Sequence, residues 1–142
     1  MIHLGNILHI NPYEYDEVWV ICYSVGDILD KIDNNTNVFH VPELAPSKEL
    51  FDKYRTMVHS GNWNREAFIK YYVPIFLEDI RKNDNALKHL KSLVEKSEEK
   101  NIILTCFCED ESICHRSIVA GILKNLGALI NCNPEYKVYS LV

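Results

Sequence analysis

The stretch NIILTCFCEDESICHRSIVAGIL, residues 101–123, predicts the centre of the fold. Its first eight residues are almost continuously apolar, which is typical of a parallel strand covered on both faces. Apolar residues then recur with helical spacing, and Gly127 is a good residue to end that helix. We therefore expect a strand, a short polar loop and a helix. The buried stripe of the helix comprises Ile118, Val119, Ile122, Leu123 and Leu126.

Further strands and helices are expected to alternate along the chain. β-Branched and aromatic runs predict strands at 17–24 and 37–41, with weaker candidates at 128–130 and 136–142, and residues 2–10 suggest an edge strand or hairpin. Helices are expected at 26–32, after Ser47, along 68–80 with a break at Pro74, and from Asp84. This order predicts one α/β domain over residues 1–142, a three-layer, Rossmann-like sandwich with a mostly parallel central sheet.

Composition limits the classes of function. The chain has 142 residues, of which 47% are hydrophobic, and its net charge is −5. That negative charge argues against broad contact with a phosphate backbone, so nucleic acid is an unexpected partner. No apolar run has membrane-spanning length and no signal peptide is visible, which predicts a cytoplasmic protein without membrane contact. In such a setting we expect reduced and mostly buried thiols, which here are Cys22, Cys106, Cys108, Cys114 and Cys132.

The loop CEDESICH, residues 108–115, is the most informative place to look for a site. Ligands of parallel sheets usually bind beyond the carboxyl ends of the strands, where this loop begins. Cys106 and Cys108 share a face if the strand stays regular, while Cys114 and His115 stand at the helix start. Metal binding, thiol chemistry and anion binding all use residues of these types.

A zinc ion is conceivable if Cys106, Cys108, Cys114 and His115 converge. The paired C-x-x-C knuckles typical of structural zinc sites are absent. The sequence therefore assigns no metal ligand and leaves the cofactor unknown.

A catalytic thiolate is the second interpretation, with Cys114 and His115 as the candidate catalytic residues. Cys114 stands near a helix start and beside a basic residue, a setting that favours the thiolate. Seven residues separate Cys108 from Arg116, so the loop of cysteine phosphatases, which has five, does not fit. An inert buried thiol is the structural alternative.

Anion binding is the favoured interpretation, with Cys106 and Arg116 as the ligand-binding residues. A helix start offers free amides, and an arginine fork suits phosphate or carboxylate. The acidic residues 109–111 occupy the approach, so pairing of Arg116 with one of them is the alternative. His115 continues the apolar stripe of the helix, and a core histidine that fixes the loop is at least as compatible with that position as catalysis.

Aromatic residues gather at 63–76 and are expected mainly in the core, because their spacing is helical. Trp63 and Tyr71 are the two that we expect to reach a cleft.

Three segments together resemble the DUF488 family of small α/β proteins: LAPSKELFDKY (44–54), FIKYYVPIFLEDI (68–80) and residues 103–123. The resemblance spans roughly residues 37–127. It implies an α/β fold and a shared site at Cys106, Cys114, His115 and Arg116, but no established reaction. Position 108, commonly acidic in the family pattern, is a cysteine here, which weakens a metal site that depends on it. The stretch before LAPS is less basic than in relatives, which weakens the case for a shared polyanionic ligand.

The resulting hypothesis is a pocket at the carboxyl edge of the central strand that binds an anionic, phosphate- or nucleotide-like small molecule. Cysteine and histidine chemistry would accompany binding if the protein is an enzyme, which the sequence leaves open. The alternative is a non-enzymatic interaction domain in which the Cys-His-Arg motif is structural.

Overall fold

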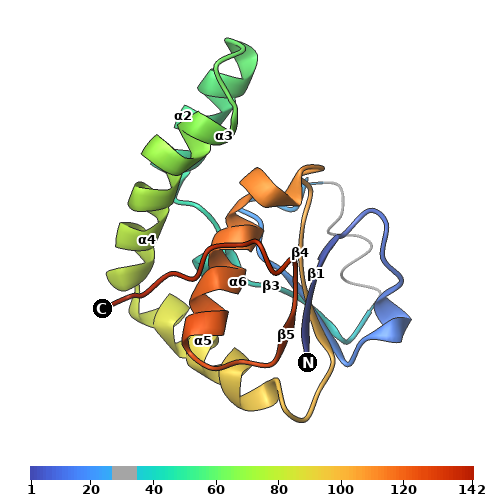
Figure 1. Ribbon diagram of the computed structural model, residues 1–142. Helices are drawn as coiled ribbons and strands as arrows, with labels where there is room; N and C mark the ends of the chain where they lie inside the picture. The colour runs from blue at the N-terminus through green and yellow to red at the C-terminus, as the bar shows by residue number, and fades with distance from the viewer. Residues whose placement is uncertain (27–34) are drawn as a thin grey trace.

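A parallel sheet forms the middle of the molecule (Figure 1). The structure is a computed structural model that describes residues 1–26 and 35–142. Its described residues form five parallel strands in the order β3-β2-β4-β1-β5, which confirms the predicted α/β sandwich. The strands are β1 (Ile2–Asn6), β2 (Glu17–Val20), β3 (Val38–His40), β4 (Ile102–Cys106) and β5 (Ile130–Asn131).

The predicted central strand is β4. All five of its residues are buried, and it pairs with β2 on one side and β1 on the other. Its one hydroxyl, on Thr105, donates to the carbonyl of Trp19 on β2 at 3.1 Å, so no polar side-chain group of the strand lacks a partner. The continuous apolar run therefore corresponds to burial on both faces, as expected for a parallel strand.

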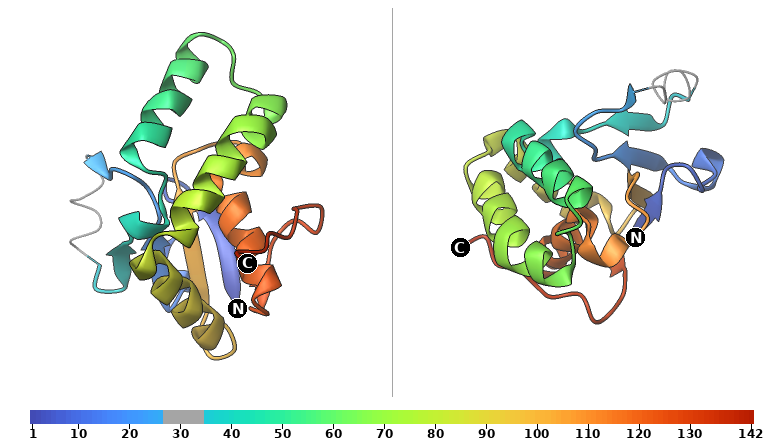
Figure 2. Two further views of the ribbon diagram at one scale, coloured as in Figure 1. Left: turned by 90° about the vertical axis from the view of Figure 1, so that its left-hand side faces the viewer. Right: turned by 90° about the horizontal axis from the view of Figure 1, so that it is seen from above.

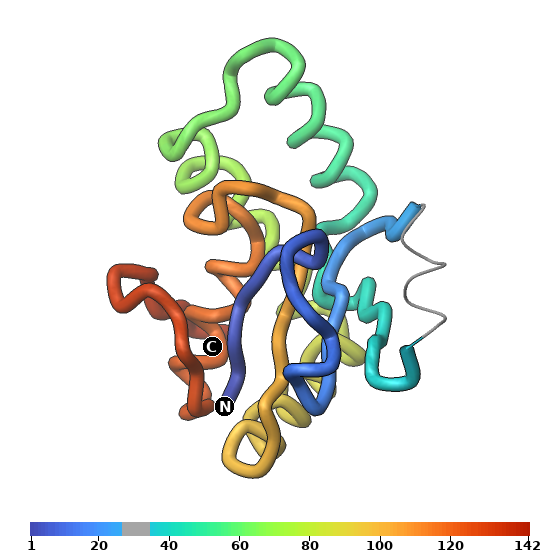
Figure 3. Tube along the Cα trace, turned by 90° about the vertical axis from the view of Figure 1, so that its right-hand side faces the viewer, coloured from blue at the N-terminus to red at the C-terminus, as the bar shows by residue number. Residues whose placement is uncertain are grey.

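Helices cover one face of the sheet (Figure 2). Ile102 and Leu104 of β4 pack there against a core that includes residues of these helices. Ile103 points to the opposite face, where residues of the segment 7–15 pack on the sheet (Figure 3). The four longest described helices are α2 (Lys48–His59), α4 (Val73–Arg81), α5 (Asp84–Lys96) and α6 (His115–Asn125).

Local sequence explains where the helices begin and break. The hydroxyl of Ser47 accepts the Leu50 amide at 3.2 Å and caps α2, as predicted. A short α3 (Arg65–Ala67) continues through a π-helical turn at Phe68–Tyr72 into α4. Pro74 has no amide hydrogen to donate and stands in the first turn of α4, so the break expected there takes the form of this change of helix type.

Four expectations differ from the structure or fall outside it. Residues 2–6 form an interior strand between β4 and β5, not an edge strand or hairpin. The chain leaves the sheet after Val20, earlier than predicted. Residues 136–142 form no strand, because the Tyr139 amide donates to the carbonyl of Gly121 on α6 and the segment lies over that helix. The helix expected at 26–32 lies, beyond Gly26, outside the described residues.

Within the described ranges, we find no helix whose length and apolarity would suffice to cross a bilayer.

The packing of 136–142 on α6 gives a stability prediction. A Cβ atom on Gly121 would lie 2.1 Å from the carbonyl oxygen of Lys137 and 2.6 Å from the ring of Tyr139. Gly121→Ala should therefore lower the free energy of unfolding by roughly 1–3 kcal/mol, although alanine is the better helix former. Urea denaturation measures the effect. Asn125→Ala, at an exposed position of the same helix, is the control and should change stability by less than about 0.5 kcal/mol. Equal stability of the two variants would contradict this packing.

Candidate functional site

The end of β4 and the start of α6 lie side by side because a short loop joins them. Cys106 is the last residue of β4, and Cys114 is the N-cap residue of α6. Between them the carboxylate of Asp110 accepts the amide of Ser112 at 3.1 Å and starts a 3₁₀ turn, Glu111–Ile113. This turn brings the chain back over the carboxyl edge of the sheet.

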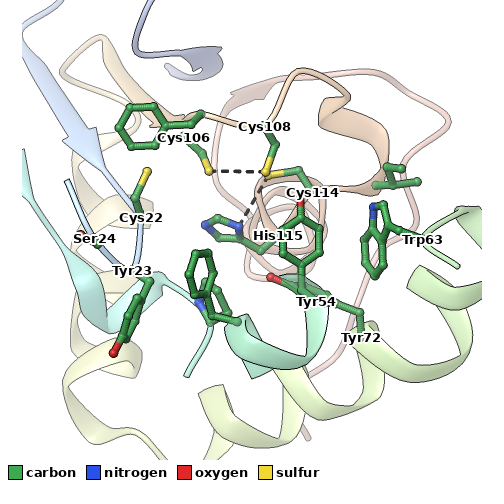
Figure 4. Close-up of a pocket in the computed structure, with 14 residues that line it drawn as sticks. Cys22, Tyr23, Ser24, Tyr54, Trp63, Tyr72, Cys106, Cys108, Cys114 and His115 are labelled. Carbon is green, nitrogen blue, oxygen red and sulfur yellow. Dashed lines mark hydrogen bonds between the residues drawn. The ribbon is translucent and has the colours of Figure 1, made fainter. Parts of the chain in front are cut away.

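A cavity of about 260 Å³ lies beyond this edge (Figure 4). Its floor carries four thiols and an imidazole, from Cys22, Cys106, Cys108, Cys114 and His115. Its walls are aromatic and come mainly from α2 and from the segments beside it. These wall residues are Tyr23, Phe51, Tyr54, Trp63, Tyr72 and Phe107.

The sulfur atoms and the imidazole lie close together. Cys106 Sγ and Cys108 Sγ are 3.9 Å apart, and Cys114 Sγ is 3.5 Å from His115 Nδ1 (Figure 4). The ligand-type atoms of Cys106, Cys114 and His115 all lie within 4.8 Å of one another, and all three residues are buried. Such a group of soft donors could hold a metal ion.

Arg116 lies behind this floor and is only 2% exposed. Its guanidinium donates to the carbonyls of Gly5 and Cys108, and its Nε lies 3.4 Å from Cys114 Sγ. Within residues 1–26 and 35–142, no carboxylate forms an ion pair with it. Burial lowers the pKa of Arg116, but the negative charge of the nearby sulfur atoms and of Glu111 raises it overall.

The acidic loop does not pair directly with Arg116. Asp110 hydrogen-bonds to Ser112, and Glu111 accepts the hydroxyl of Tyr136 at 2.6 Å. The pairing of Arg116 with a neighbouring acid, which was the alternative to anion binding, is therefore not formed. Its donors meet backbone carbonyls and a sulfur instead.

His115 is held in one orientation by a hydrogen bond to the main chain. Its Nε2 donates to the carbonyl of Ile21, just beyond the end of β2. This bond directs Nδ1 toward Cys114 Sγ. Burial alone would lower the pKa of His115, but the negative charge of Cys114 and Cys106 and the bond to Ile21 raise it to about 9.

The thiols differ in their pKa values. Hydrogen bonds from Cys108, Cys114 and Cys22 stabilise the thiolate of Cys106 and lower its pKa well below the usual range. The same contacts with Cys106, together with burial, raise the pKa of the Cys22 and Cys108 thiols. Negative charge is therefore concentrated on the sulfur at the end of β4, near both buried cations.

The structure brings most of the predicted site residues together. Cys106, Cys114 and His115 all reach the cavity, whereas Arg116 supports it from behind. Cys108, which the family pattern does not require, also reaches it. Trp63 lines the cavity as expected, whereas Tyr71 lines a separate pocket beside Met57 and Lys70.

Sequence reasoning missed Cys22 and the aromatic walls from α2. The strand predicted at 17–24 ends in Ile-Cys-Tyr-Ser, so the rule that ligands bind beyond strand ends also pointed to Cys22. The sequence carried no such signal for the walls, because the helical spacing of Phe51 and Tyr54 is typical of ordinary core positions.

Comparison with known proteins gives one match. The family model DUF488-N3a, described as the active DUF488-N3 subclade, matches residues 11–127. The chain belongs to this family, and the resemblance to DUF488 is confirmed. A search of the curated proteins gave no match, and a search of the solved structures gave none.

Replacement of the buried guanidinium should be strongly destabilising. Arg116→Met leaves the carbonyls of Gly5 and Cys108 without a donor and the thiolates without a counter-charge, so we expect a loss of about 3–5 kcal/mol. Arg116→Lys keeps the charge and should recover part of that loss. Arg65→Met removes an exposed arginine that donates to Ser112, and should cost less than about 1 kcal/mol. Urea denaturation of all three variants measures these losses. Equal losses of stability in Arg116→Met and Arg65→Met would contradict the charge argument.

The raised pKa of His115 predicts a pH dependence. Its pKa rises from 6.5 to about 9 on folding, so the folded state binds the proton more tightly. The stabilisation is complete below pH 6.5 and is lost as the pH rises toward about 9. The stability difference between wild type and His115→Gln should therefore be largest below pH 6.5 and shrink across that interval. Denaturation at several pH values measures it, and a difference that grows with pH would show that the imidazole is neutral when folded.

Proposed function

We propose that this DUF488-N3a protein binds a small, flat, negatively charged molecule in the cavity and brings it against the thiols of Cys106 and Cys114. The observation that carries the proposal is the combination of aromatic walls with an ionised floor at the carboxyl edge of a parallel sheet. A pocket with a few polar groups set among apolar walls is the usual form of a small-molecule site.

The walls suit a ring-shaped ligand. Tyr23 stacks on Phe51 with ring centroids 5.2 Å apart, and Tyr54 meets Trp63 edge to face at 4.8 Å. These rings leave a cavity of about 260 Å³, which accommodates one small ring system with its substituents. Aromatic faces attract flat ligands by stacking, which supports a planar molecule over a flexible chain.

Local charge supports an anion. Arg116 and protonated His115 place two positive charges behind and on the floor, against the thiolate of Cys106. The chain as a whole is negative, so attraction of an anion has to come from this local arrangement. The guanidinium acts through charge and position, because its N–H groups already donate to protein atoms.

Cys114 is the proposed nucleophile. Its sulfur lies 3.4 Å from Arg116 Nε and 3.5 Å from His115 Nδ1, so two cationic groups face the atom that would attack the ligand. In the proposed step, Cys114 Sγ forms a bond to an electrophilic carbon of the ligand. The bond from that carbon to the leaving group breaks, and the leaving group takes the electron pair with a proton from His115 Nδ1.

The non-enzymatic alternative also has an observation in its favour. Cys114 is 3% and His115 4% exposed, which suits a motif that only fixes the loop. A thiol with that role reacts slowly with small reagents in the folded protein, so reactivity separates the two functions.

Alkylation with a charged and a neutral reagent tests the proposal. Iodoacetate is a small anion, and iodoacetamide is its neutral counterpart. The iodoacetate-to-iodoacetamide rate ratio at Cys114 should exceed the same ratio at Cys132 by about tenfold, because of these two thiols only that of Cys114 lies in the positive pocket. Fragmentation of the tryptic peptide 101–116 assigns the modified thiol among Cys106, Cys108 and Cys114.

Cys132 lies outside the cavity and so serves as an internal control for reagent chemistry. Benzoate, a flat anion, should slow labelling at Cys114 and leave Cys132 unchanged. Equal rate ratios at the two thiols would overturn the anion preference. A Cys114 that resists both reagents in the metal-free, folded protein would favour the structural alternative.

A further inference from the structure

We propose that Cys106, Cys114 and His115 hold a soft divalent metal ion of the zinc class, with one coordination position open to the cavity. This inference deepens the proposed binding of a ligand, since it uses the same floor, and it does not depend on which ligand the cavity takes. It begins from the one group of three metal-type donors found in the described part of the chain. A bound metal would occupy Cys114 Sγ and His115 Nδ1, so the nucleophilic step proposed above belongs to the metal-free protein.

One donor pair already has the spacing of tetrahedral zinc, and the others lie close to it. Zinc lies about 2.3 Å from sulfur and about 2.0–2.1 Å from nitrogen, so donor atoms around one ion are about 3.8 Å apart for two sulfurs and about 3.6 Å for sulfur and nitrogen. Cys114 Sγ and His115 Nδ1 are 3.5 Å apart, and all three donor pairs lie within 4.8 Å. A metal ion therefore requires only small side-chain movements.

The imidazole is oriented as a ligand would be. Its Nε2 donates to the carbonyl of Ile21, which leaves Nδ1 as the atom available to a metal. A metal-binding histidine usually gives its other ring N–H to a carbonyl or carboxylate in this way. The bond also fixes the ring, so His115 is preorganised before a metal arrives.

Charge balance favours a metal in this place. Two thiolates and one divalent ion are together neutral, and Arg116 beside Cys114 then adds a single positive charge. A buried pair of thiolates without a metal would repel each other. The residual positive charge also suits an anionic group of a ligand at the open position, which connects the metal to the proposed function.

Cys108 decides whether the site is open or closed. Its sulfur is 3.9 Å from that of Cys106, yet it does not belong to the compact group of donors. The three donors of that group all line the cavity, so the fourth position faces it. Three protein ligands with an open position are typical of catalytic zinc, whereas four protein ligands are typical of structural zinc.

Titration of the reduced full-length protein with cobalt(II) under argon tests the site, because cobalt reports coordination by its colour. We expect saturation at one equivalent, a sulfur-to-cobalt charge-transfer band and intense visible bands of a tetrahedral ion. Zinc should displace the cobalt, and one equivalent of zinc should slow alkylation of Cys114 at least about tenfold. Wild type that shows no such bands overturns the inference.

Variants assign the ligands. Cys114→Ser and His115→Gln should each weaken cobalt binding by about tenfold or more, whereas Cys132→Ser should not change it. Cys108→Ser should still bind one equivalent of cobalt. A variant that no longer binds cobalt would overturn the open three-ligand site. Far-UV circular dichroism of each metal-free variant checks folding, and the wild-type titration decides the inference if a variant does not fold. Bands that survive in both ligand variants would also overturn it.

The proposal of a metal site and the proposal of an anion pocket can be contradicted separately. Tetrahedral cobalt without an iodoacetate preference at Cys114 in the metal-free protein would support the metal and contradict the anion pocket. The preference without tetrahedral cobalt would support the pocket and contradict the metal.

Discussion

The guanidinium of Arg116 is the constraint on which the site depends. It is almost fully buried, and its three donor groups bind β1 through Gly5, the loop after β4 through Cys108, and the start of α6 through Cys114. No carboxylate in the described ranges forms an ion pair with it. Burial lowers its pKa, whereas the nearby sulfur atoms and the more distant charge of Glu111 raise it. One side chain thus fixes both the geometry of the loop and the ionisation of the thiols.

His115 is coupled to the same charge from the opposite side of Cys114. Its raised pKa follows from the nearby sulfur atoms and from the carbonyl of Ile21, a residue 94 positions earlier in the chain. Neither cation is explained by its sequence neighbour Cys114 alone, because each also contacts a carbonyl far away in the chain. Each is stable because parallel strands bring the ends of β2 and β4 and the backbone of β1 to one place, where a few polar atoms can satisfy one another.

Sequence alone predicted the parts of the fold that depend on local patterns. The apolar run of β4, the cap at Ser47 and most of the stripe of α6 each carry a periodicity or a residue preference, and each was found at its expected place. Leu126, expected in that buried stripe, is exposed because the helix ends at Asn125. The interior position of β1 and the packing of residues 136–142 on α6 depend on long-range contacts, which no local pattern encodes. The contact of Arg116 with the carbonyl of Gly5 was not predicted for the same reason, because spacing rules carry no information about a partner 111 positions away in the chain.

The two halves of the cavity come from different parts of the chain, and this division has a consequence for function. The ionised floor belongs mainly to residues 106–115, whereas most of the aromatic wall belongs to residues 23–72. A change in Phe51 can therefore alter the shape of the cavity without removing a polar partner of the sulfur atoms, whereas a change in Tyr54 would also affect a group that interacts with Cys108. The family match at 11–127 contains the whole cavity, but it excludes β1, which supplies one carbonyl to Arg116. That contact uses a backbone atom, so Arg116 depends on the position of β1 in the sheet.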